Sequence, residues 1–332
     1  MENTYLSVII PCYNEEENIE IFYNEIKVAL GKLINKTELI FVNDGSTDKT
    51  LESLKKVYET HEYNVKIIDF SRNFGKESAL LVGLEKSNGK YVAIIDADLQ
   101  QNPKYIVEML DILKNNPNYD AVAAYQELRK ESKIASLYKK CFYKVLNRMM
   151  EVEIKEAASD FRVLKRNVVE AILSLPEKSR FSKGIFSWIG FNTYYMPYMV
   201  EERRYGTSKW KFSNLLKYGI EGIVSFSGKP LMISNYIGII MVIGSILGFI
   251  IMFILNSICN KDINMIWCAM LLIILVSGIQ LISIGIIGIY LLKNYIETKN
   301  RPAYIVRNVI ENKDIKEEKN EKYINYGKRR IC

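Results

Sequence analysis

The sequence is nearly without histidine, because its 332 residues include only His61. A nucleophilic triad that depends on a histidine base is therefore not expected. Two glycine-rich phosphate-binding patterns are also missing: no G-x-x-x-x-G-K-[ST] occurs, and no G-x-G-x-x-G follows a predicted strand. Their absence argues against a P-loop nucleotide site and against a Rossmann dinucleotide site.

Cysteine is sparse and irregularly placed. The five cysteines show no metal-ligand spacing: Cys12, Cys141, Cys259, Cys268 and Cys332. This pattern suits free thiols in a reducing compartment. The N-terminal segment MENTYLSVII also lacks a basic region followed by a long apolar core, so no secretory signal is expected.

Charged residues are absent from two long apolar stretches towards the C-terminal end. One lies between Lys229 and Lys261, and the other lies between Asp262 and Lys293. Since about 20 apolar residues cross a bilayer, we predict two transmembrane helices at about 231–257 and 265–292, which form a hairpin within residues 230–293. Two buried core helices are the alternative, but core helices rarely run this long without a polar face.

The distribution of lysine and arginine orients this hairpin. The linker holds only Lys261, whereas both outer ends are flanked by basic residues: Lys211, Lys217, Lys229, Lys293, Lys299, Arg301 and Arg307. We therefore predict a multi-pass plasma-membrane protein with both termini and the N-terminal domain on the cytoplasmic side. The net charge of +7 predicts an anionic lipid leaflet as the binding partner rather than nucleic acid, because the basic residues gather near the membrane segments.

The segments on either side of the hairpin differ in composition. Residues 210–229 carry apolar and basic residues at helical spacing, which predicts amphipathic helices in the membrane interface. A plain amphipathic surface helix is the alternative. Residues 294–332 are predicted to be a cytoplasmic tail, and their mixed-charge, apolar-poor end is expected to be disordered.

Residues 1–209 alternate between short apolar runs and helical patterns. Strands are predicted at Leu6–Ile10, Glu38–Val42, Val65–Phe70, Tyr91–Ile95, Ala158–Leu164 and Tyr194–Val200. Helices are predicted at Glu15–Leu33, Asp48–Glu59, Lys76–Ser87, Arg129–Val152 and Val168–Leu173. This alternation predicts one α/β domain with a mostly parallel sheet and helices on both faces.

Acidic and amide residues follow three of the predicted strands. The segments are PCYNE at 11–15, NDGS at 43–46 and DADLQ at 96–100. In open parallel sheets ligands bind beyond the carboxyl ends of the strands. An Asp-x-Asp pair there can offer oxygens to Mg²⁺ or Mn²⁺, which often share substrate phosphates. We predict a metal-bridged diphosphate at this edge, whereas a solvated turn is the alternative for an isolated Asp-x-Asp.

Several ordered segments carry a family resemblance: SVIIPCYNEEENI, FVNDGSTDKT, SRNFGKESALLVGLEKSNGKYVAIIDADLQ, ASDFRVLKR and ERRYGTSKW. They resemble family 2 glycosyltransferases, and among these the polyprenyl-phosphate glycosyltransferases, which include dolichol-phosphate mannose synthases and bactoprenol glucosyltransferases. The later segments GIQLISIGIIGIYL and YIETKNRPAYIV resemble the bactoprenol branch. The resemblance covers about residues 5–307 and implies a GT-A fold, a nucleotide-sugar donor, Mg²⁺ or Mn²⁺, and a lipid phosphate acceptor at the cytoplasmic face.

The resemblance also implies which residues meet the nucleotide. Pro11, Tyr13 and Glu15 would hold it, and Asp44 would lie at the base or ribose. Asp96 would face the nucleotide side as well. All of these residues follow predicted strands.

The remaining implied site residues meet the metal, the sugar and the phosphates. Asp98 with Gln100 would meet the metal ion, and Asp160 would lie beside the reacting centre. Phosphates would be contacted by Arg203, Ser208 and Lys209. Arg203 is favoured over Arg204 because of its distance from Gly206, although the choice stays open. Asp98, Asp160 and Arg203 form the predicted catalytic set.

The implied reaction is an inverting transfer of one sugar, with UDP favoured over GDP, to undecaprenyl phosphate. A phosphate monoester is largely ionised near neutral pH. Asp160 would therefore orient the acceptor or balance positive charge at the sugar rather than remove a proton. Metal and cationic side chains would stabilise the leaving diphosphate. The residues do not identify the sugar.

Two other functions fit the sequence less well. Processive polysaccharide synthases generally carry more membrane spans and a Gln-x-x-Arg-Trp motif, which this chain lacks. An inactive membrane scaffold with a sugar-binding fold would not need the clustered charge of Asp44, Asp96, Asp98 and Arg203. A homo-oligomer is compatible with the small residues in the spans, which permit close helix packing: Gly238, Gly244, Gly248, Gly278, Gly285 and Gly288.

Overall fold

The computed structural model of the chain describes residues 4–60, 62–126, 147–149, 155, 158–199, most of 222–251, and 265–311. It forms two compact units. The first unit contains residues 1–132, 154–209 and 302–332, and the second contains residues 133–153 and 210–301. The first unit therefore takes in chain from both sides of the predicted membrane segments.

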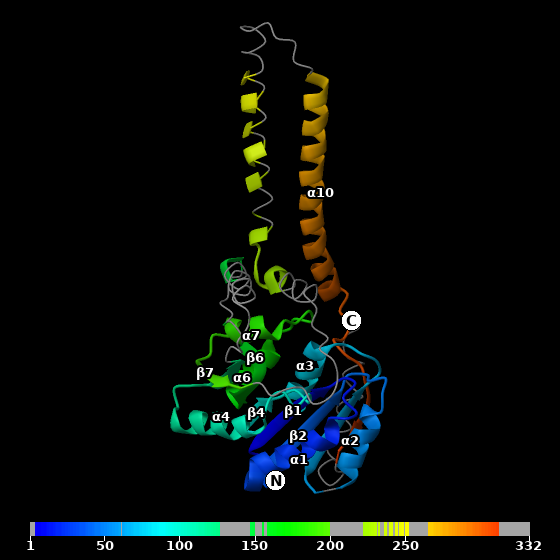
Figure 1. Cartoon of the computed structure of the whole chain (residues 1–332), viewed down its shortest axis with the longest axis vertical. Coiled ribbons are helices and arrows are strands. Elements are labelled where there is room, and N and C mark those ends of the chain that lie inside the picture. The colour runs from blue at the N-terminus through cyan, green and yellow to red at the C-terminus, as the bar shows by residue number, and fades with distance from the viewer. Residues whose placement is uncertain are drawn as a thin grey trace, which may run out of the picture. The chain divides into compact units, whose positions relative to one another are not determined.

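The first unit is built on an eight-stranded sheet in the order β7-β5-β6-β4-β1-β2-β3-β8 (Figure 1). Its strands are β1 Leu6–Cys12, β2 Thr37–Asn43, β3 Asn64–Phe70, β4 Tyr91–Ile94, β5 Ala121–Gln126, β6 Ala158–Lys165, β7 Thr193–Tyr198 and β8 Val306–Ile310. Strands β4, β1, β2 and β3 are parallel, as are β5 and β7. Strand β6 is antiparallel to both β4 and β5, and β8 is antiparallel to β3. The predicted α/β domain with a mostly parallel sheet is confirmed.

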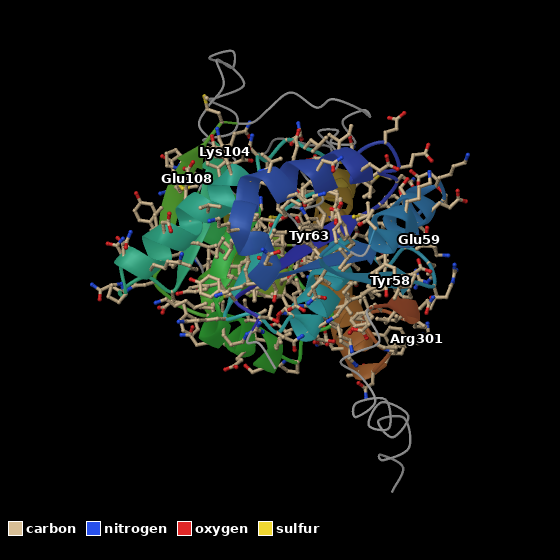
Figure 2. All side chains as sticks on the ribbon, turned by 90° about the horizontal axis from the view of Figure 1, so that it is seen from below. Tyr58, Glu59, Tyr63, Lys104, Glu108 and Arg301 are labelled. Carbon is tan, nitrogen blue, oxygen red and sulfur yellow. The ribbon has the colours of Figure 1, made fainter. Side chains whose placement is uncertain are left out.

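Helices cover both faces of this sheet. They are α1 Ile19–Leu30, the 3-10 helix η1 Gly31–Lys36, α2 Thr50–Glu59, α3 Lys76–Lys86, α4 Lys104–Asn115, α6 Arg166–Ser174 and α7 Ser182–Trp188. Helix α1 contacts α4 and α2, so these three lie side by side. Figure 2 views this face, with Lys104 and Glu108 of α4 on one flank and Tyr58 and Glu59 of α2 on the other.

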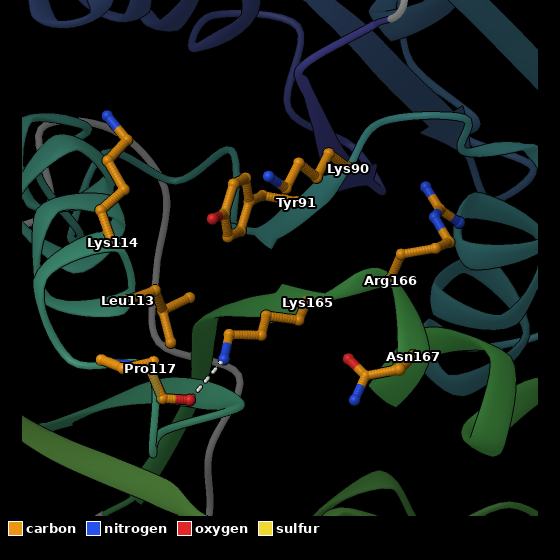
Figure 3. A pocket seen from close by; sticks show the side chains of 8 residues that line it. All are labelled: Lys90, Tyr91, Leu113, Lys114, Pro117, Lys165, Arg166 and Asn167. Atoms are coloured by element: carbon orange, nitrogen blue, oxygen red, sulfur yellow. Dashed lines mark hydrogen bonds between the residues drawn. The ribbon is translucent and has the colours of Figure 1, made fainter.

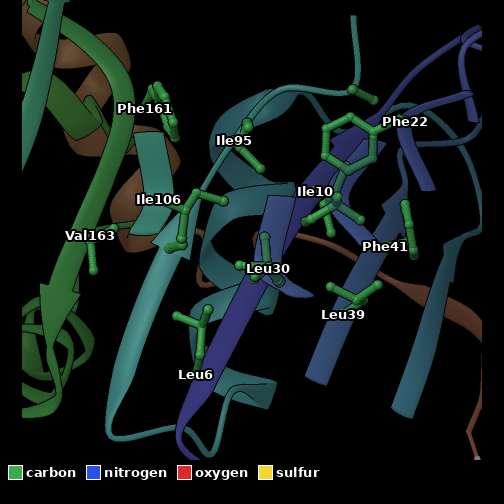
Figure 4. Packing of buried hydrophobic residues seen from close by; sticks show 14 of the residues in the cluster. Leu6, Ile10, Phe22, Leu30, Leu39, Phe41, Ile95, Ile106, Phe161 and Val163 are labelled. Carbon is green, nitrogen blue, oxygen red and sulfur yellow. The ribbon is translucent and has the colours of Figure 1, made fainter. Parts of the chain in front are cut away.

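The central strand β1 is buried on both sides, which explains its continuous apolar run. Ile10 packs in the cluster beneath α1 and α4, together with Phe22, Phe41 and Ile106 (Figure 4). Phe22 and Phe41 meet edge to face, with their ring centroids 6.4 Å apart. Ile9 points to the opposite face, where α3 approaches closely: a Cβ added at Gly83 would lie 2.3 Å from Ile9 Cγ2. Packing on two faces therefore fixes the sheet from which the site loops project.

Strand β8 was not predicted, and it lies inside the predicted tail 294–332. It pairs with β3, which would otherwise be the edge strand, from Ile67 opposite Ile310 to Phe70 opposite Val306. The residues just before it also pack on the domain, because the Tyr304 ring stacks on Phe70 with centroids 5.2 Å apart. Ser71 N donates to Ile305 O at 3.0 Å, next to the loop that follows β3. The segment that follows the last apolar helix is thus part of the sheet domain.

The predicted boundaries differ from the observed ones mainly at turns. Helix α1 begins at Ile19 rather than Glu15, because the Glu15 backbone N–H donates to Thr50 Oγ1 at 2.8 Å and holds the preceding loop. The elements α4, β5 and α7 were not predicted from the sequence. Most of the predicted helix Arg129–Val152 lies outside the described residues, although 147–149 are helical.

The second unit contains helix α10, Met265–Thr298, which is 34 residues long. Its segment Leu275–Thr298 is long and apolar enough to cross a membrane. It is the single such helix in the part of the chain that the structure describes. The described residues between 236 and 251 are also helical. The rest of the predicted first span lies outside the described residues, so the hairpin stays a prediction.

Candidate active site

Two acidic side chains meet at the carboxyl end of the central strands. Asp96 follows β4, and Asp160 lies in the neighbouring β6. Ile94 pairs with Arg162 in the antiparallel ladder, so continuing this register brings Asp96 beside Asp160. Two predicted site residues that are far apart in the sequence are therefore adjacent because of strand pairing.

Lys76, the first residue of α3, lies between these two carboxylates. Its Nζ is 2.6 Å from Asp96 Oδ1 and 3.0 Å from Asp160 Oδ2. Lys76 was not among the predicted site residues, although it lies in a segment that carries the family resemblance. The signal that could have identified Lys76 is its position at a helix N-terminus, because the helix dipole favours acidic residues there. A lysine at that position indicates that acidic groups from other elements lie close to it.

The charged groups in this cluster shift one another's pKa values. Burial would raise the pKa of Asp160, but the positive charges of Lys76, Lys183 and Arg162 outweigh it and hold that pKa well below its usual range. Burial would lower the pKa of Lys76, but Asp160 and Asp96 raise it above its usual value. At neutral pH Lys76 is therefore a cation and Asp160 is an anion. Burial raises the pKa of Asp96, against the opposing charge of Lys76.

Helix α7 completes the surroundings of Asp160. The carboxylate of Glu77 accepts hydrogen bonds from Ser182 N at 3.0 Å and from Ser182 Oγ, which fixes the start of α7 against the start of α3. Burial lowers the pKa of Lys183 on α7, while the charge of Asp160 opposes this shift. The Arg162 guanidinium lies over the Phe186 ring, 3.5 Å from its centroid. Cations from three different elements thus surround one carboxylate.

The turn after β4 shapes the predicted metal ligands. Gln100 N donates to Asp98 Oδ1 at 3.2 Å, and Gln101 Nε2 donates to Asp96 Oδ2 at 3.3 Å. Between them Leu99 adopts φ +60° although its side chain is fully buried. A non-glycine residue in this region costs on the order of 1 kcal/mol or more. The buried side chain of Leu99 therefore anchors a strained turn that presents Asp98.

The oxygen donors of the site determine whether a divalent cation fits. Among the described residues, no group of three or more His, Cys, Asp or Glu side chains could hold a metal ion by itself. Mg²⁺ and Mn²⁺ accept oxygen ligands, and Mg²⁺ commonly takes one or two carboxylates together with substrate phosphates and water. Asp98 and Gln100 offer oxygens of this kind, so they suit a cation that is shared with a bound diphosphate.

Asp44 has a defined structural role. Its carboxylate is buried and accepts hydrogen bonds from Phe74 N at 2.7 Å and Gly75 N at 3.0 Å. Burial raises the pKa of Asp44, while these two hydrogen bonds and the charge of Arg72 oppose that rise. Asp44 therefore holds the loop that directly precedes Lys76. Its predicted contact with the base or ribose stays a prediction.

The loop after β1 is bound to the loop after β2. Asn14, with φ +55°, donates from its N–H to Ser46 Oγ at 3.0 Å and accepts from Thr47 N at 2.9 Å. Pro11 lies near the end of β1, and Tyr13 is 36% exposed. These predicted nucleotide residues thus sit on the same edge of the sheet as Asp96. The predicted phosphate residues Arg203, Ser208 and Lys209 lie outside the described residues.

Gly45, between these loops, is predicted to be intolerant of substitution. It has φ +61°, and an added Cβ would lie 2.2 Å from the backbone carbon of Arg72. We expect Gly45→Ala to destabilise the purified protein by about 1–3 kcal/mol from backbone strain, and by more because of the clash. The control is Gly190→Ala, at φ +71° with nothing within 4 Å of the added Cβ. Equal losses in thermal unfolding of the two variants would contradict this account.

A separate hollow of about 410 Å³ lies at the opposite end of the strands from Asp96, where β4 begins and β6 ends (Figure 3). It is lined by Lys90, Tyr91, Leu113, Lys114, Pro117, Lys165, Arg166 and Asn167. Lys165 Nζ donates to Pro117 O at 3.0 Å, and Arg166 donates to the carbonyl oxygens of Ser87 and Gly89. These cations therefore hold the protein backbone, and none of the predicted site residues lines this hollow.

Several known proteins are similar to this chain in sequence. Residues 7–173 match the model of the family Glycosyl transferase family 2. The chain is 39% identical over 318 residues to the "Putative glycosyltransferase CsbB" of Bacillus subtilis (strain 168), with 96% of each chain covered. It is 40% identical to the "Uncharacterized glycosyltransferase sll0501" of Synechocystis sp., over 91% of this chain and 94% of that one. It is 36% identical to the "Bactoprenol glucosyl transferase" of Shigella phage SfV, over 91% and 98%.

Among solved structures, the glucosyl-3-phosphoglycerate synthase from Mycobacterium tuberculosis superposes with a TM-score of 0.49 at 19% identity. The superposition covers 67% of this chain and 78% of that one. Likeness at this level transfers no function to the present chain.

Proposed function

Because the chain belongs to glycosyltransferase family 2, we propose that it transfers a single sugar from a UDP-sugar to undecaprenyl phosphate, with inversion at the anomeric carbon. Glucose is the first candidate for the sugar. The observation that carries this proposal is the similarity to the bactoprenol glucosyl transferase, which runs over 91% of this chain and so extends beyond the catalytic domain. An apolar helix of 34 residues follows the domain and would keep it at a membrane that holds a lipid acceptor.

In the proposed reaction, an oxygen of the acceptor phosphate attacks the anomeric carbon while the bond to the nucleoside diphosphate breaks. The acceptor is largely ionised near neutral pH, so no base is needed to activate it. Asp160 is proposed to orient the acceptor and to balance positive charge at the anomeric carbon. An anion beside an anionic acceptor would be repulsive alone. Lys76, Lys183 and Arg162 offset that repulsion, because each places positive charge beside Asp160.

The remaining proposed roles concern the donor. Pro11, Tyr13 and Glu15 would hold the nucleotide with Asp44 and Asp96, which all lie at the same sheet edge. Asp98 and Gln100 would hold Mg²⁺ or Mn²⁺, which supplies charge neutralisation on the leaving diphosphate. Phosphate contacts are proposed for Arg203, Ser208 and Lys209.

The proposed membrane arrangement places the catalytic domain 1–209 on the cytoplasmic face. Residues 210–229 would lie in the interface, and helices 231–257 and 265–292 would cross the bilayer. Helix α10 supports one of these crossings by its length and apolar composition. The acceptor phosphate lies at the headgroup level, so this anchor would keep the strand-end acids near their substrate.

The test is a donor panel with purified full-length protein, undecaprenyl phosphate and Mg²⁺ or Mn²⁺. We expect UDP-glucose to label the lipid with one sugar, and UDP-galactose, UDP-N-acetylglucosamine and GDP-mannose to label it poorly. Mass spectrometry of the product checks that a single hexose is attached. Absence of labelled lipid with every donor would refute the proposal. Addition of several sugars to one acceptor would instead indicate a processive synthase.

A further inference from the structure

Charge compensation at Asp160 alone does not explain why Lys76 also contacts the carboxylate of Asp96. Lys76 is the first residue of α3, and its side chain reaches two carboxylates, one just after β4 and one in β6. We propose that Lys76 is a positioning residue, which holds Asp96 and Asp160 side by side so that Asp160 faces the reacting sugar in one fixed arrangement. This inference rests on the proposed role of Asp160 in sugar transfer.

The geometry supports this role in three ways. Lys76 Nζ contacts both carboxylates within 3.0 Å, so one ammonium group fixes the spacing of two acids. The loop before it is held in turn by Asp44, which accepts from Phe74 N and Gly75 N. The helix that carries it is tied to α7 through Glu77 and Ser182. Contacts made by the residues just before and just after Lys76 therefore fix its position.

The electrostatics explain why a cation is needed between the acids. Two adjacent carboxylates repel each other, and partial burial strengthens the repulsion because it is less screened. The side chains of Asp96 and Asp160 are only 27% and 20% exposed, whereas that of Lys76 is 41% exposed. Without Lys76, we expect the two carboxylates to move apart, which would misplace Asp160.

The predicted readout is the turnover number. Lys76→Met keeps a side chain of similar length without its charge. It should lower kcat by on the order of 100-fold, which is typical of a displaced catalytic group. The KM for the donor should change little, since an interaction made only in the transition state affects kcat and kcat/KM equally. Lys76→Arg retains the charge and should recover part of the lost kcat. Lys56→Met, on the exposed face of α2, is the matched control and should match wild type.

A double-mutant cycle separates positioning from a merely structural role. If Lys76 acts through Asp160, Lys76→Met in an Asp160→Asn background should change kcat by no more than about twofold. Twofold is about the error within which the effects of independent mutations add. Multiplied losses in the double variant would overturn the proposal, as would a Lys76→Met variant with wild-type kcat. If Lys76→Met does not fold, Lys76→Arg carries the same cycle, because its altered geometry should lower kcat only when Asp160 is present.

The cycle is run with whichever nucleotide-sugar and polyprenyl phosphate support turnover by the wild-type protein. A different sugar or acceptor would refute that part of the proposed function while leaving the Lys76 test intact. Conversely, efficient glucose transfer together with multiplicative losses would keep the proposed function and reject the role of Lys76.

Discussion

Replacing Asp98 with alanine should reduce sugar transfer by about a thousandfold or more. A metal ion on a leaving phosphate is worth several kcal/mol, and each 1.36 kcal/mol corresponds to about tenfold in rate. Asp98 lies in the strained turn around Leu99, and Gln100 N donates to it. The measurement is lipid labelling at saturating donor, together with Mn²⁺ affinity in the presence of UDP.

Two further variants sharpen this prediction. Asp98→Asn keeps an acceptor for Gln100 N but removes the charge, so it should lose activity nearly as fully as the alanine variant. Asp111→Ala, on the exposed face of α4, is the control for removal of an acidic residue and should retain activity. An active Asp98→Asn variant beside an inactive Asp98→Ala variant would show that the turn, rather than the carboxylate, is needed. Unchanged Mn²⁺ affinity in both would remove Asp98 from the metal site.

Replacing Asp160 with asparagine should lower kcat by about 100- to 1,000-fold, the usual cost of losing one electrostatic stabiliser in an active site. The charge of Asp160 is firmly maintained, because Lys76, Lys183 and Arg162 hold its pKa below the usual range. Asparagine keeps the shape but leaves these cations without that anion. Steady-state kinetics with the acceptor varied would measure the effect.

The matched control for this substitution is Asp120→Asn. Asp120 Oδ1 lies 3.7 Å from Lys165 Nζ at the opposite end of the strands. Asp120 therefore also pairs with a lysine, but far from the predicted site residues. It should leave kcat unchanged. If Asp160→Asn keeps kcat near the wild-type value while folding normally, Asp160 has no role in the chemical step.

Much of the domain could be predicted because its strands are short, apolar and separated by helical patterns. The acids after β1, β2 and β4 were placed at one edge by the general behaviour of parallel sheets. The pairing of Asp96 with Asp160 was not predictable in the same way. It depends on the antiparallel register of β4 and β6, which no local pattern encodes. Lys76 was missed because its partners come from those two strands.

The elements that were missed have weak local signals. Strand β5 reads AVAAYQ, and alanine has low strand propensity. Helix α7 is short and contains Gly184, which disfavours a helix. Strand β8 reads VRNVI beside a mixed-charge tail, and it is stabilised by its partner β3 rather than by its own composition. Tertiary contacts therefore determine the structure of β5, α7 and β8.

The position of β8 has a consequence for how the protein is made. Synthesis proceeds from the N-terminus, so the ribosome completes α10 before it reaches Val306–Ile310. Until then β3 keeps an unpaired edge, and an open edge strand can pair with other chains. The sheet is therefore finished only after the apolar helix α10 has been synthesised. For the same reason, a soluble fragment that ends before residue 302 would lack its edge strand, and residues 302–311 need to be joined back to it.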